Sequence, residues 1–313
     1  MASNSEFVLN ALVAERDELK LHCERLQRQL DAQGYPPGHF YSPVVDVNDS
    51  CAIRAVQDRL AAPLPAGIQL DERAMTATMQ RLAEHHKLFP FPRDFQSGFR
   101  FYWDNPFFGC HDASVFFSML LEFRPRRVVE VGSGFSSRLL LDTRDRFPGL
   151  AVDSTLIDPQ LDALLPTLEI AGDRDVHLLP HRVQDTPHSI FEQLGANDML
   201  FIDSSHVSKT GSDVNFCLFE ILPRLGAGAL IHIHDILYPF EYPAAWILGE
   251  KRSWNEAYLV RAFLQYNSAF EILYWNNYAY HRLQDSLRAL MPLCLGNEGG
   301  SLWLRKSPEP LTR

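Results

Sequence analysis

The sequence has little cysteine and no closely spaced pair of cysteines. The five cysteines stand far apart, at Cys23, Cys51, Cys110, Cys217 and Cys294. An odd, scattered set without a CxxC pair argues against a disulfide framework and a zinc knuckle, because both need cysteines at characteristic spacings. We therefore expect a protein of a reducing compartment, the cytoplasm.

Long apolar runs are also missing. No stretch approaches the roughly 20 apolar residues that a helix needs to cross a bilayer. The first ten residues, MASNSEFVLN, lack the basic segment followed by an apolar segment that marks a secretory signal. These absences predict a protein without a membrane span, which agrees with a cytoplasmic location.

Positive charge is scarce as well. The 313 residues contain 29 Lys and Arg against 39 Asp and Glu, which gives a net charge of −10. An acidic chain disfavours binding to nucleic acid or to an anionic membrane, because both need a basic surface. Hydrophobic (46%) and aromatic (12%) residues are plentiful enough for a sizeable core. The length suits one large domain with additions, or two modest domains.

Residues 1–34 carry a heptad pattern that predicts one helix over residues 5–33. Leucines recur every seven residues, and further apolar residues fall three positions before them, while Arg16 and Gln33 interrupt the pattern. The apolar positions are Leu9, Leu12, Leu19, Cys23, Leu26 and Leu30. A seam of about three and a half heptads favours a coiled coil that makes a homodimer or docks a partner. The alternative is an amphipathic helix packed on its own domain.

Residues 35–111 are expected to form a linker and a cap. Prolines and short apolar runs predict an irregular linker over residues 35–66, and a helix is expected over residues 71–87. An aromatic stretch follows between Phe99 and Phe108. These aromatic side chains either line a substrate entrance or pack the N-terminal region onto the main domain.

From residue 112 onward, helices and strands alternate. The predicted helices cover residues 112–123, 136–146, 160–170, 187–194, 211–225 and 255–267. The predicted strands cover residues 127–132, 151–157, 176–179, 198–203, 228–234, 270–275 and 300–305. Such alternation predicts a Rossmann-like α/β domain over residues 112–313, with a doubly wound parallel sheet covered by helices on both faces.

A glycine turn after the first of these strands is the strongest local signal. The strand delivers the chain to Gly132, Ser133 and Gly134, and a helix starts directly afterwards. A dinucleotide site would place a third glycine where Ser137 stands, and no P-loop lysine follows. Glu130 lies two residues before the first glycine, and a carboxylate there suits a cationic ligand better than a pyrophosphate.

Polar residues follow the next two strands. Asp158 ends the second strand, where it could accept hydrogen bonds from two ribose hydroxyls or cap the following helix at Pro159. Gln184 and Asp185 follow the third strand. They either hold an adenine amino group or belong to a solvated turn.

Over residues 112–305 the chain resembles the class I S-adenosylmethionine-dependent methyltransferases. Glu130, Gly132 and Gly134 match the first motif of that family, Asp158 matches the acid after its second strand, and Asp203 matches the position after its fourth strand. The resemblance implies a seven-stranded sheet with a final antiparallel strand, for which residues 300–305 are suited. It also implies S-adenosylmethionine as the cofactor.

Acids and histidines gather at the ends of the strands at 198–203 and 228–234. Asp203 and His206 follow the first of these strands, and His234 and Asp235 end the second. If the two strands are neighbours, these side chains converge at one edge of the sheet, and all four are ligand types for divalent metals. His232 shares a strand face with His234, but it lies deeper and is interpreted as a hydrogen-bonded core residue.

This arrangement is similar to two branches of the superfamily, the catechol-type O-methyltransferases and the cephalosporin-hydroxylase-like proteins. The resemblance implies Asp203 and Asp235 as metal ligands, with His234 as a third. Oxygen ligands alone would favour magnesium. A site that includes His206 and His234 would suit manganese, iron or zinc, and could support oxygen chemistry.

The predicted reaction is methyl transfer by in-line displacement at the sulfonium, onto a small-molecule or sugar-type acceptor. His206 is the first candidate for the general base and His234 the second. An aromatic loop over residues 238–246 either forms a lid or acceptor wall, or packs as part of the core. The alternatives to a methyltransferase are a metal-dependent hydroxylase on the same fold and a non-catalytic scaffold built around the coiled coil.

Overall fold

The computed structural model describes residues 2–32, 34–161, 165 and 175–307. The chain divides into two compact units. The first comprises Met1–Asp58 and Pro243–Ser253, and the second comprises Arg59–Tyr242 and Trp254–Arg313. The predicted boundaries at residues 34 and 111 stay predictions.

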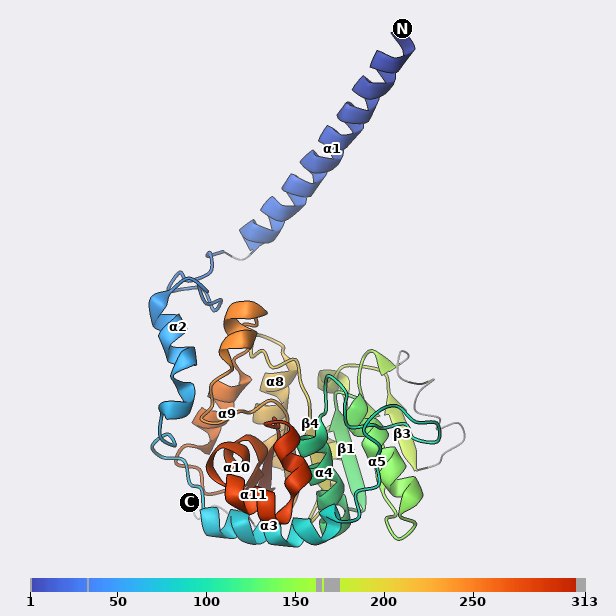
Figure 1. Cartoon of the computed structure of the whole chain (residues 1–313), viewed down its shortest axis with the longest axis vertical. Coiled ribbons are helices and arrows are strands. Elements are labelled where there is room, and N and C mark those ends of the chain that lie inside the picture. Colours follow the sequence, from blue (N-terminus) through green and yellow to red (C-terminus); the bar gives the residue numbers. More distant parts are fainter. Residues whose placement is uncertain (1, 33, 162–164, 166–174, 308–313) are drawn as a thin grey trace. The chain divides into compact units, whose positions relative to one another are not determined.

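The first unit is mainly helical. Helix α1 (Ala2–Ala32) is the single long helix drawn in dark blue in Figure 1. Helix α2 (Ser50–Gln57) lies in the segment that was expected to be irregular, and the Asp49 carboxylate caps it by accepting a hydrogen bond from the Cys51 amide. A π-helical turn, η6, covers Ala245–Gly249.

The second unit is built around a seven-stranded sheet in the order β3-β2-β1-β4-β5-β7-β6, which confirms the predicted Rossmann-like α/β fold. Strand β7 pairs antiparallel with both β5 and β6, as the resemblance implied, and the strands from β1 to β5 pair in parallel. The strands are β1 (Arg127–Val131), β2 (Asp153–Ile157), β3 (Val176–Leu179), β4 (Met199–Ile202), β5 (Leu230–Ile233), β6 (Phe270–Trp275) and β7 (Leu302–Lys306).

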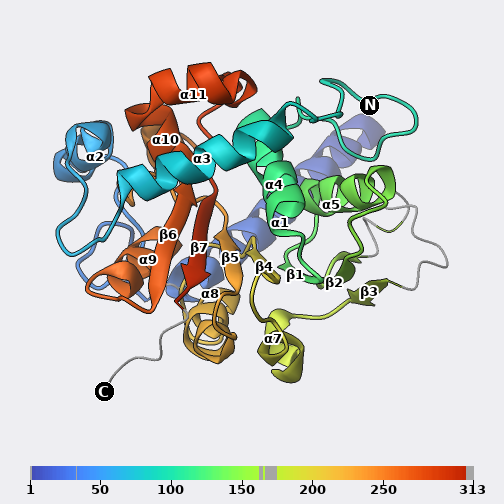
Figure 2. The same ribbon diagram turned by 90° about the horizontal axis from the view of Figure 1, so that it is seen from below.

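Helices cover both faces of this sheet, as Figure 2 shows. One face carries α3 (Glu72–His86), α4 (Cys110–Phe123), α5 (Phe135–Arg146), α10 (Asn276–Arg282) and α11 (Gln284–Leu290). The other carries α7 (Ser189–Glu192), α8 (Asp213–Phe216) and α9 (Glu256–Leu264). Every residue of β4 and β5 is buried, because a parallel strand in this position has helices on both sides.

Two helical segments differ from the expectation. The single helix predicted over residues 211–225 consists of α8, a π-helical turn η4 (Cys217–Ile221) and a 3-10 turn η5 (Leu222–Arg224). Pro223 explains the break, because it has no amide hydrogen and its ring clashes with the carbonyl four residues earlier. The sequence pattern also missed α10 and α11. Most of the helix predicted over residues 160–170 lies outside the described residues.

The aromatic cap packs onto the sheet domain through buried phenylalanines. The ring of Phe91 lies 5.4 Å from that of Phe101 and 5.9 Å from that of Phe117 in α4. These contacts favour the packing interpretation for the inner aromatic residues of the cap, since all three side chains are buried. Phe107, by contrast, is 74% exposed.

The Asp142 carboxylate joins the cap to α5. It accepts hydrogen bonds from the backbone amides of Arg100 and Phe101 at 2.8 and 3.0 Å, and it pairs with the Arg100 guanidinium at 2.8 Å. We expect Asp142→Ala to lower the free energy of unfolding by about 3–5 kcal/mol, because it leaves two backbone amides without their acceptor and removes the buried partner of a poorly exposed cation.

Urea unfolding checks this prediction. Asp145 also pairs with Arg100, but its side chain is 44% exposed, so Asp145→Ala is the matched control and should cost less than about 1 kcal/mol. Equal losses in the two variants would contradict the role given to Asp142.

Candidate functional site

The glycine turn after β1 is held against the end of β4. Gly132 has φ +83°, and a Cβ atom added to it would lie 1.9 Å from the carbonyl oxygen of Asp203. Its amide donates to the Ile157 carbonyl at 3.0 Å. Only glycine fits both this backbone conformation and this close approach.

Gly134 and Ser137 complete the turn in a different way. Gly134 precedes α5 with φ −169°, an extended conformation that any residue adopts, and a Cβ there would meet no atom within 4 Å. Its amide donates to the Ser137 hydroxyl at 3.1 Å. Ser137, which replaces the third glycine of a dinucleotide motif, therefore caps the first turn of α5.

Asp158 links the glycine turn to the segment after β2. One carboxylate oxygen accepts a hydrogen bond from the Ser133 amide at 3.0 Å, and the other accepts from the Gln160 amide at 2.6 Å. The Asp158 carboxylate thus joins the backbone of the glycine turn to the backbone of the segment after β2. Each of its oxygens keeps a further lone pair for a ligand hydroxyl.

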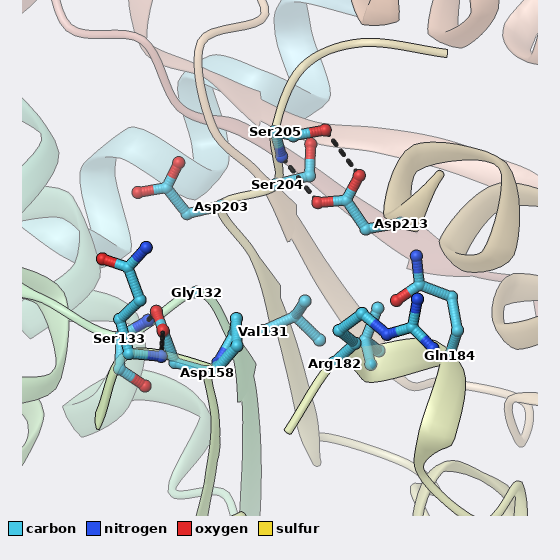
Figure 3. A pocket seen from close by; sticks show the side chains of 13 residues that line it. Val131, Gly132, Ser133, Asp158, Arg182, Gln184, Asp203, Ser204, Ser205 and Asp213 are labelled. Carbon is cyan, nitrogen blue, oxygen red and sulfur yellow. Dashed lines mark hydrogen bonds between the residues drawn. The ribbon is translucent and has the colours of Figure 1, made fainter. Parts of the chain in front are cut away.

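A cavity of about 520 Å³ lies at the carboxyl edge of β1, β2 and β4 (Figure 3). Figure 3 places Ser133 and Asp158 together on one side of it, and Arg182 and Gln184 on the other. The lining includes Val131, Gly132, Ser133, Asp158, Pro159, Gln160, Arg182, Val183, Gln184, Asp203, Ser204, Ser205 and Asp213. Five of the predicted cofactor residues therefore surround one space: Gly132, Ser133, Asp158, Gln184 and Asp203.

The other three predicted cofactor residues lie outside that lining. Glu130 is buried behind the turn, and Gly134 begins α5. Asp185 forms a surface ion pair with Arg182 at 2.9 Å, and that pair holds the pKa of Asp185 below its ordinary value. The Gln184 amide donates to the Gly211 carbonyl at 2.8 Å.

Glu130 supports the glycine turn from inside the protein. The Ser136 hydroxyl donates to one of its oxygens, and the other oxygen has no hydrogen-bond partner among the residues that the structure describes. Burial raises the pKa of Glu130 to about 8, although hydrogen bonds with Ser136 and Ser137 oppose the shift. The carboxyl group is thus held largely neutral at pH 7. Glu130 was among the predicted site residues, whereas Ser136 was not.

This raised pKa gives the stability a pH dependence. Below pH 4.5 Glu130 is protonated in both states, and between pH 4.5 and 8 the unfolded chain ionises while the folded chain stays protonated. The free energy of unfolding therefore falls as the pH rises through this range. We expect Glu130→Gln, which is always neutral, to gain about 4 kcal/mol relative to the wild type between pH 5 and pH 8.

Urea unfolding of both proteins at pH 5 and pH 8 measures the difference. Glu84, whose side chain is 70% exposed, is the matched control, and Glu84→Gln should follow the wild type. Parallel pH profiles of Glu130→Gln and the wild type would contradict the burial argument.

The acids and histidines at the ends of β4 and β5 converge, as expected for neighbouring strands. Nε2 of His206 lies 3.3 Å from Asp203 Oδ1 and 3.7 Å from Asp235 Oδ2. Its Nδ1 lies 2.8 Å from Glu256 Oε2. The ring of Trp254 covers the imidazole at 4.2 Å. Both ring nitrogens of His206 therefore face carboxylates.

This arrangement favours a charged His206. Burial alone lowers the pKa of His206, but the hydrogen bonds to Asp203 and Glu256 and the charge of Asp235 outweigh it and raise the pKa to about 10. Glu256, in the first turn of α9, is 2% exposed. Glu256 was not among the predicted site residues, because it stands 50 residues after His206 and no local motif joins the two.

His234 is buried beside this cluster. Its Nε2 lies 3.7 Å from Asp235 Oδ1, and its Nδ1 has no hydrogen-bond partner among the described residues. Burial lowers the pKa of His234, but the charges of Asp235 and Asp203 outweigh it and raise the pKa. His232 stacks on Phe201 at 3.7 Å and bonds the Ser301 hydroxyl at 2.8 Å, in agreement with its interpretation as a core residue.

The three predicted metal ligands do not form a preformed metal site. In the part of the chain that the structure describes, no three His, Cys, Asp or Glu side chains are arranged to hold a metal ion. Asp203 and Asp235 instead share the His206 nitrogen, and this imidazole supplies a positive charge where a cation would bind. The assignment of Asp203, His234 and Asp235 to a metal stays a prediction.

The aromatic loop after β5 is largely part of the core. Tyr238, Phe240 and Tyr242 are each 1% exposed. The Tyr242 hydroxyl accepts a hydrogen bond from the Ala257 amide at 3.0 Å, at the start of α9. For these three residues the contacts favour packing over a mobile lid.

The strand order, the antiparallel β7, and the glycine turn and acids at the carboxyl edge define a class I S-adenosylmethionine-dependent methyltransferase domain. Residues 129–236 match the family model described as a methyltransferase domain, Methyltransf_24. The chain thus carries an S-adenosylmethionine-dependent methyltransferase domain.

Similar proteins give few further details. An uncharacterised protein of Archaeoglobus fulgidus is 29% identical over 169 residues, which are 52% of this chain and 75% of the relative. The solved structure titled "cmcI-N160 SAH" is 18% identical, covers 72% of this chain and 91% of its own, and has a TM-score of 0.38. A methyltransferase from Geobacter sulfurreducens is 17% identical, with 85% and 100% coverage and a TM-score of 0.33. At these TM-scores the family match and the strand order carry the assignment.

None of the helices in the described ranges combines the length and apolar character that a membrane span requires.

Proposed function

We propose that the cavity at the carboxyl edge of β1, β2 and β4 binds S-adenosylmethionine. The observation that carries this proposal is the turn at Gly132, which packs against the Asp203 carbonyl and so brings Ser133, Asp158 and Asp203 around one cavity at the sheet edge. Ligands of open α/β sheets bind outside the carboxyl ends of the strands. Asp158 has lone pairs for ribose hydroxyls, and Asp203 supplies negative charge for the sulfonium or amino group.

The acceptor in this proposal is a small molecule or a sugar. The chain carries a net charge of −10, which disfavours nucleic acid. Around the cavity, Asp203, Ser204 and Ser205 offer hydroxyl and carboxylate groups that suit a neutral polar acceptor. The protein's part in such a reaction is to align the nucleophile, the methyl carbon and the sulfur in one line.

His234 fits the role of general base better than His206. Both ring nitrogens of His206 are engaged by carboxylates, so neither is free to accept a proton from an acceptor. The Nδ1 atom of His234 has no such partner in the described part of the chain. We assign to His206 the positioning of Asp203 and Asp235, and to His234 the acceptance of the substrate proton.

Release of S-adenosylhomocysteine in the presence of sugar, phenol, amine and carboxylate acceptors tests the activity. His234→Gln should reduce the rate about 10²–10⁴-fold. It should also remove the limb of the pH profile in which the rate rises with pH as the general base loses its proton. His206→Gln should change the affinity for substrates and keep that limb. If only His206→Gln removes the limb, the two roles are reversed.

Metal analysis of the purified protein tests the remaining prediction. If Asp203 and Asp235 hold a divalent metal such as magnesium, manganese or iron, Asp203→Ala and Asp235→Ala should each abolish its binding. Metal content that survives both substitutions would exclude these residues as ligands. Stoichiometric iron together with no binding of S-adenosylmethionine would favour the hydroxylase alternative.

A further inference from the structure

Helix α1 presents a row of exposed leucines. It covers Ala2–Ala32, and a helix of this length extends about 46 Å. The leucines at heptad positions are 44–60% exposed: Leu9, Leu12, Leu19, Leu26 and Leu30. Apolar side chains on one seam of a long helix remain exposed to water unless another helix covers them.

The spacing of these residues fits a two-stranded coiled coil. Leu12, Leu19 and Leu26 take the d positions, and Leu9, Cys23 and Leu30 take a positions. This two-position seam is narrower than the apolar face of a helix that packs on a globular domain. Leu21, in contrast, stands at an f position on the opposite side and is 65% exposed.

The charges beside the seam indicate which partner and which direction fit. In a parallel pair of identical helices, each g residue faces the e residue five positions later on the other helix. Glu15 is then opposite Lys20 of the second copy, and Val8 is opposite Val13. Each opposite-charge contact occurs twice by symmetry, so the helix complements itself.

An antiparallel pair lacks the contact between Glu15 and Lys20. There g residues face g residues and e residues face e residues. The g positions hold Val8, Glu15, His22 and Gln29, and the e positions hold Val13, Lys20 and Gln27. No arrangement of these two sets places Glu15 opposite Lys20.

Arg16 occupies the one a position with a charged side chain in the middle of the seam. A polar residue at a weakens a coiled coil, but it also fixes the register and the number of strands. The Arg16 guanidinium pairs with Asp17 of its own helix at 2.7 Å, which leaves the long arginine stem to cover the seam. This favours two helices in register over larger or shifted assemblies.

We propose that α1 pairs with α1 of a second copy in a parallel, in-register coiled coil, with Cys23 facing Cys23 across the seam. Residues at the same a position face each other in such a dimer. Cys23 and Cys51 are the exposed cysteines in the described part of the chain. The proposal is independent of the cofactor site, so it can fail while the methyltransferase assignment holds.

Light scattering and oxidative cross-linking of the full chain test this proposal. We expect a mass of twice 35.7 kDa, and a disulfide-linked dimer after treatment with copper phenanthroline in air.

Cys51→Ser should cross-link like the wild type, and Cys23→Ser should not. In a chain with both of these substitutions, Leu26→Cys at d should restore cross-linking, and Leu21→Cys at f should not.

Charge reversal tests the direction of the helices separately. Lys20→Glu should weaken the dimer about tenfold, because two attractive contacts become repulsive, and adding Glu15→Lys should restore it. A monomer at every concentration would overturn the proposal. Equal cross-linking through Leu26→Cys and Leu21→Cys, or no rescue by Glu15→Lys, would overturn the parallel arrangement.

Discussion

Replacing Gly132 by alanine is expected to weaken the binding of S-adenosylmethionine more than 100-fold. The added methyl group would lie 1.9 Å from the Asp203 carbonyl oxygen, and the residue has a positive φ of 83°. The turn and the end of β4 must therefore move apart. Both elements line the cavity, so the movement changes the positions of Ser133 and Asp203 together.

Gly134→Ala is the matched control for this prediction. It stands two residues later in the same motif, but its φ is −169° and a Cβ would meet no atom within 4 Å. We expect its affinity to stay within a few-fold of the wild type. Calorimetric titration measures both variants, and circular dichroism shows that each is folded.

If Gly132→Ala does not fold, Asp158→Asn serves as the test variant instead. The asparagine side chain has the shape of the aspartate side chain but carries no charge. Asp158→Asn should bind the cofactor at least tenfold more weakly. Affinities of Gly132→Ala and Gly134→Ala that fall together, or Asp158→Asn that binds like the wild type, would contradict the cofactor site.

Replacing His206 by glutamine is expected to lower the free energy of unfolding by about 3–5 kcal/mol at pH 7. The substitution leaves Asp203, Asp235 and Glu256 around a neutral amide. Glu256 is 2% exposed and Asp235 is 17% exposed. Because water reaches Asp235 and Glu256 poorly, their charges need the imidazolium between them, whereas the Asp203 side chain is 40% exposed.

The expected pH dependence follows from the raised pKa of His206. The folded-state pKa of about 10 exceeds the ordinary value of 6.5. The contribution of His206 is therefore fully present below pH 6.5 and is lost as the pH rises through 10. The difference between the wild type and His206→Gln should shrink over the same range.

An exposed histidine of the same sheet provides the control. His177 pairs with Asp153 at 3.0 Å, and the two side chains are 55% and 50% exposed. Urea unfolding of His177→Gln should show a loss below about 1 kcal/mol. A similar small loss in His206→Gln would show that the three carboxylates do not depend on this cation.

The parts of the fold that the sequence predicted are those with strong local signals. The strands predicted at 127–132 and 198–203 are short and mostly apolar. They end at Gly132 and Asp203, and glycine and aspartate are both uncommon in strands. Their alternation with helices predicted a doubly wound sheet, and the resemblance supplied the antiparallel last strand. The glycine turn was found because Gly132 follows a strand and precedes a helix.

The parts that the sequence did not predict depend on contacts between distant residues. Glu256 and His206 are neighbours only because α9 packs beside the end of β4, so the charge of the imidazole was not foreseen. The prediction of His206 as the first candidate for the general base was made without knowledge of this partner. Helices α10 and α11 were missed because their short segments lack a clear apolar period, and Pro223 broke a helix that had been expected to be continuous.

The most direct test of the central claim is a calorimetric titration of the purified chain with S-adenosylmethionine, repeated with Gly132→Ala and Gly134→Ala. The structure predicts one site per chain in the wild type and in Gly134→Ala, and no measurable site in Gly132→Ala. No heat of binding in the wild type, or equal binding in all three proteins, would contradict a cofactor site between Gly132, Asp158 and Asp203.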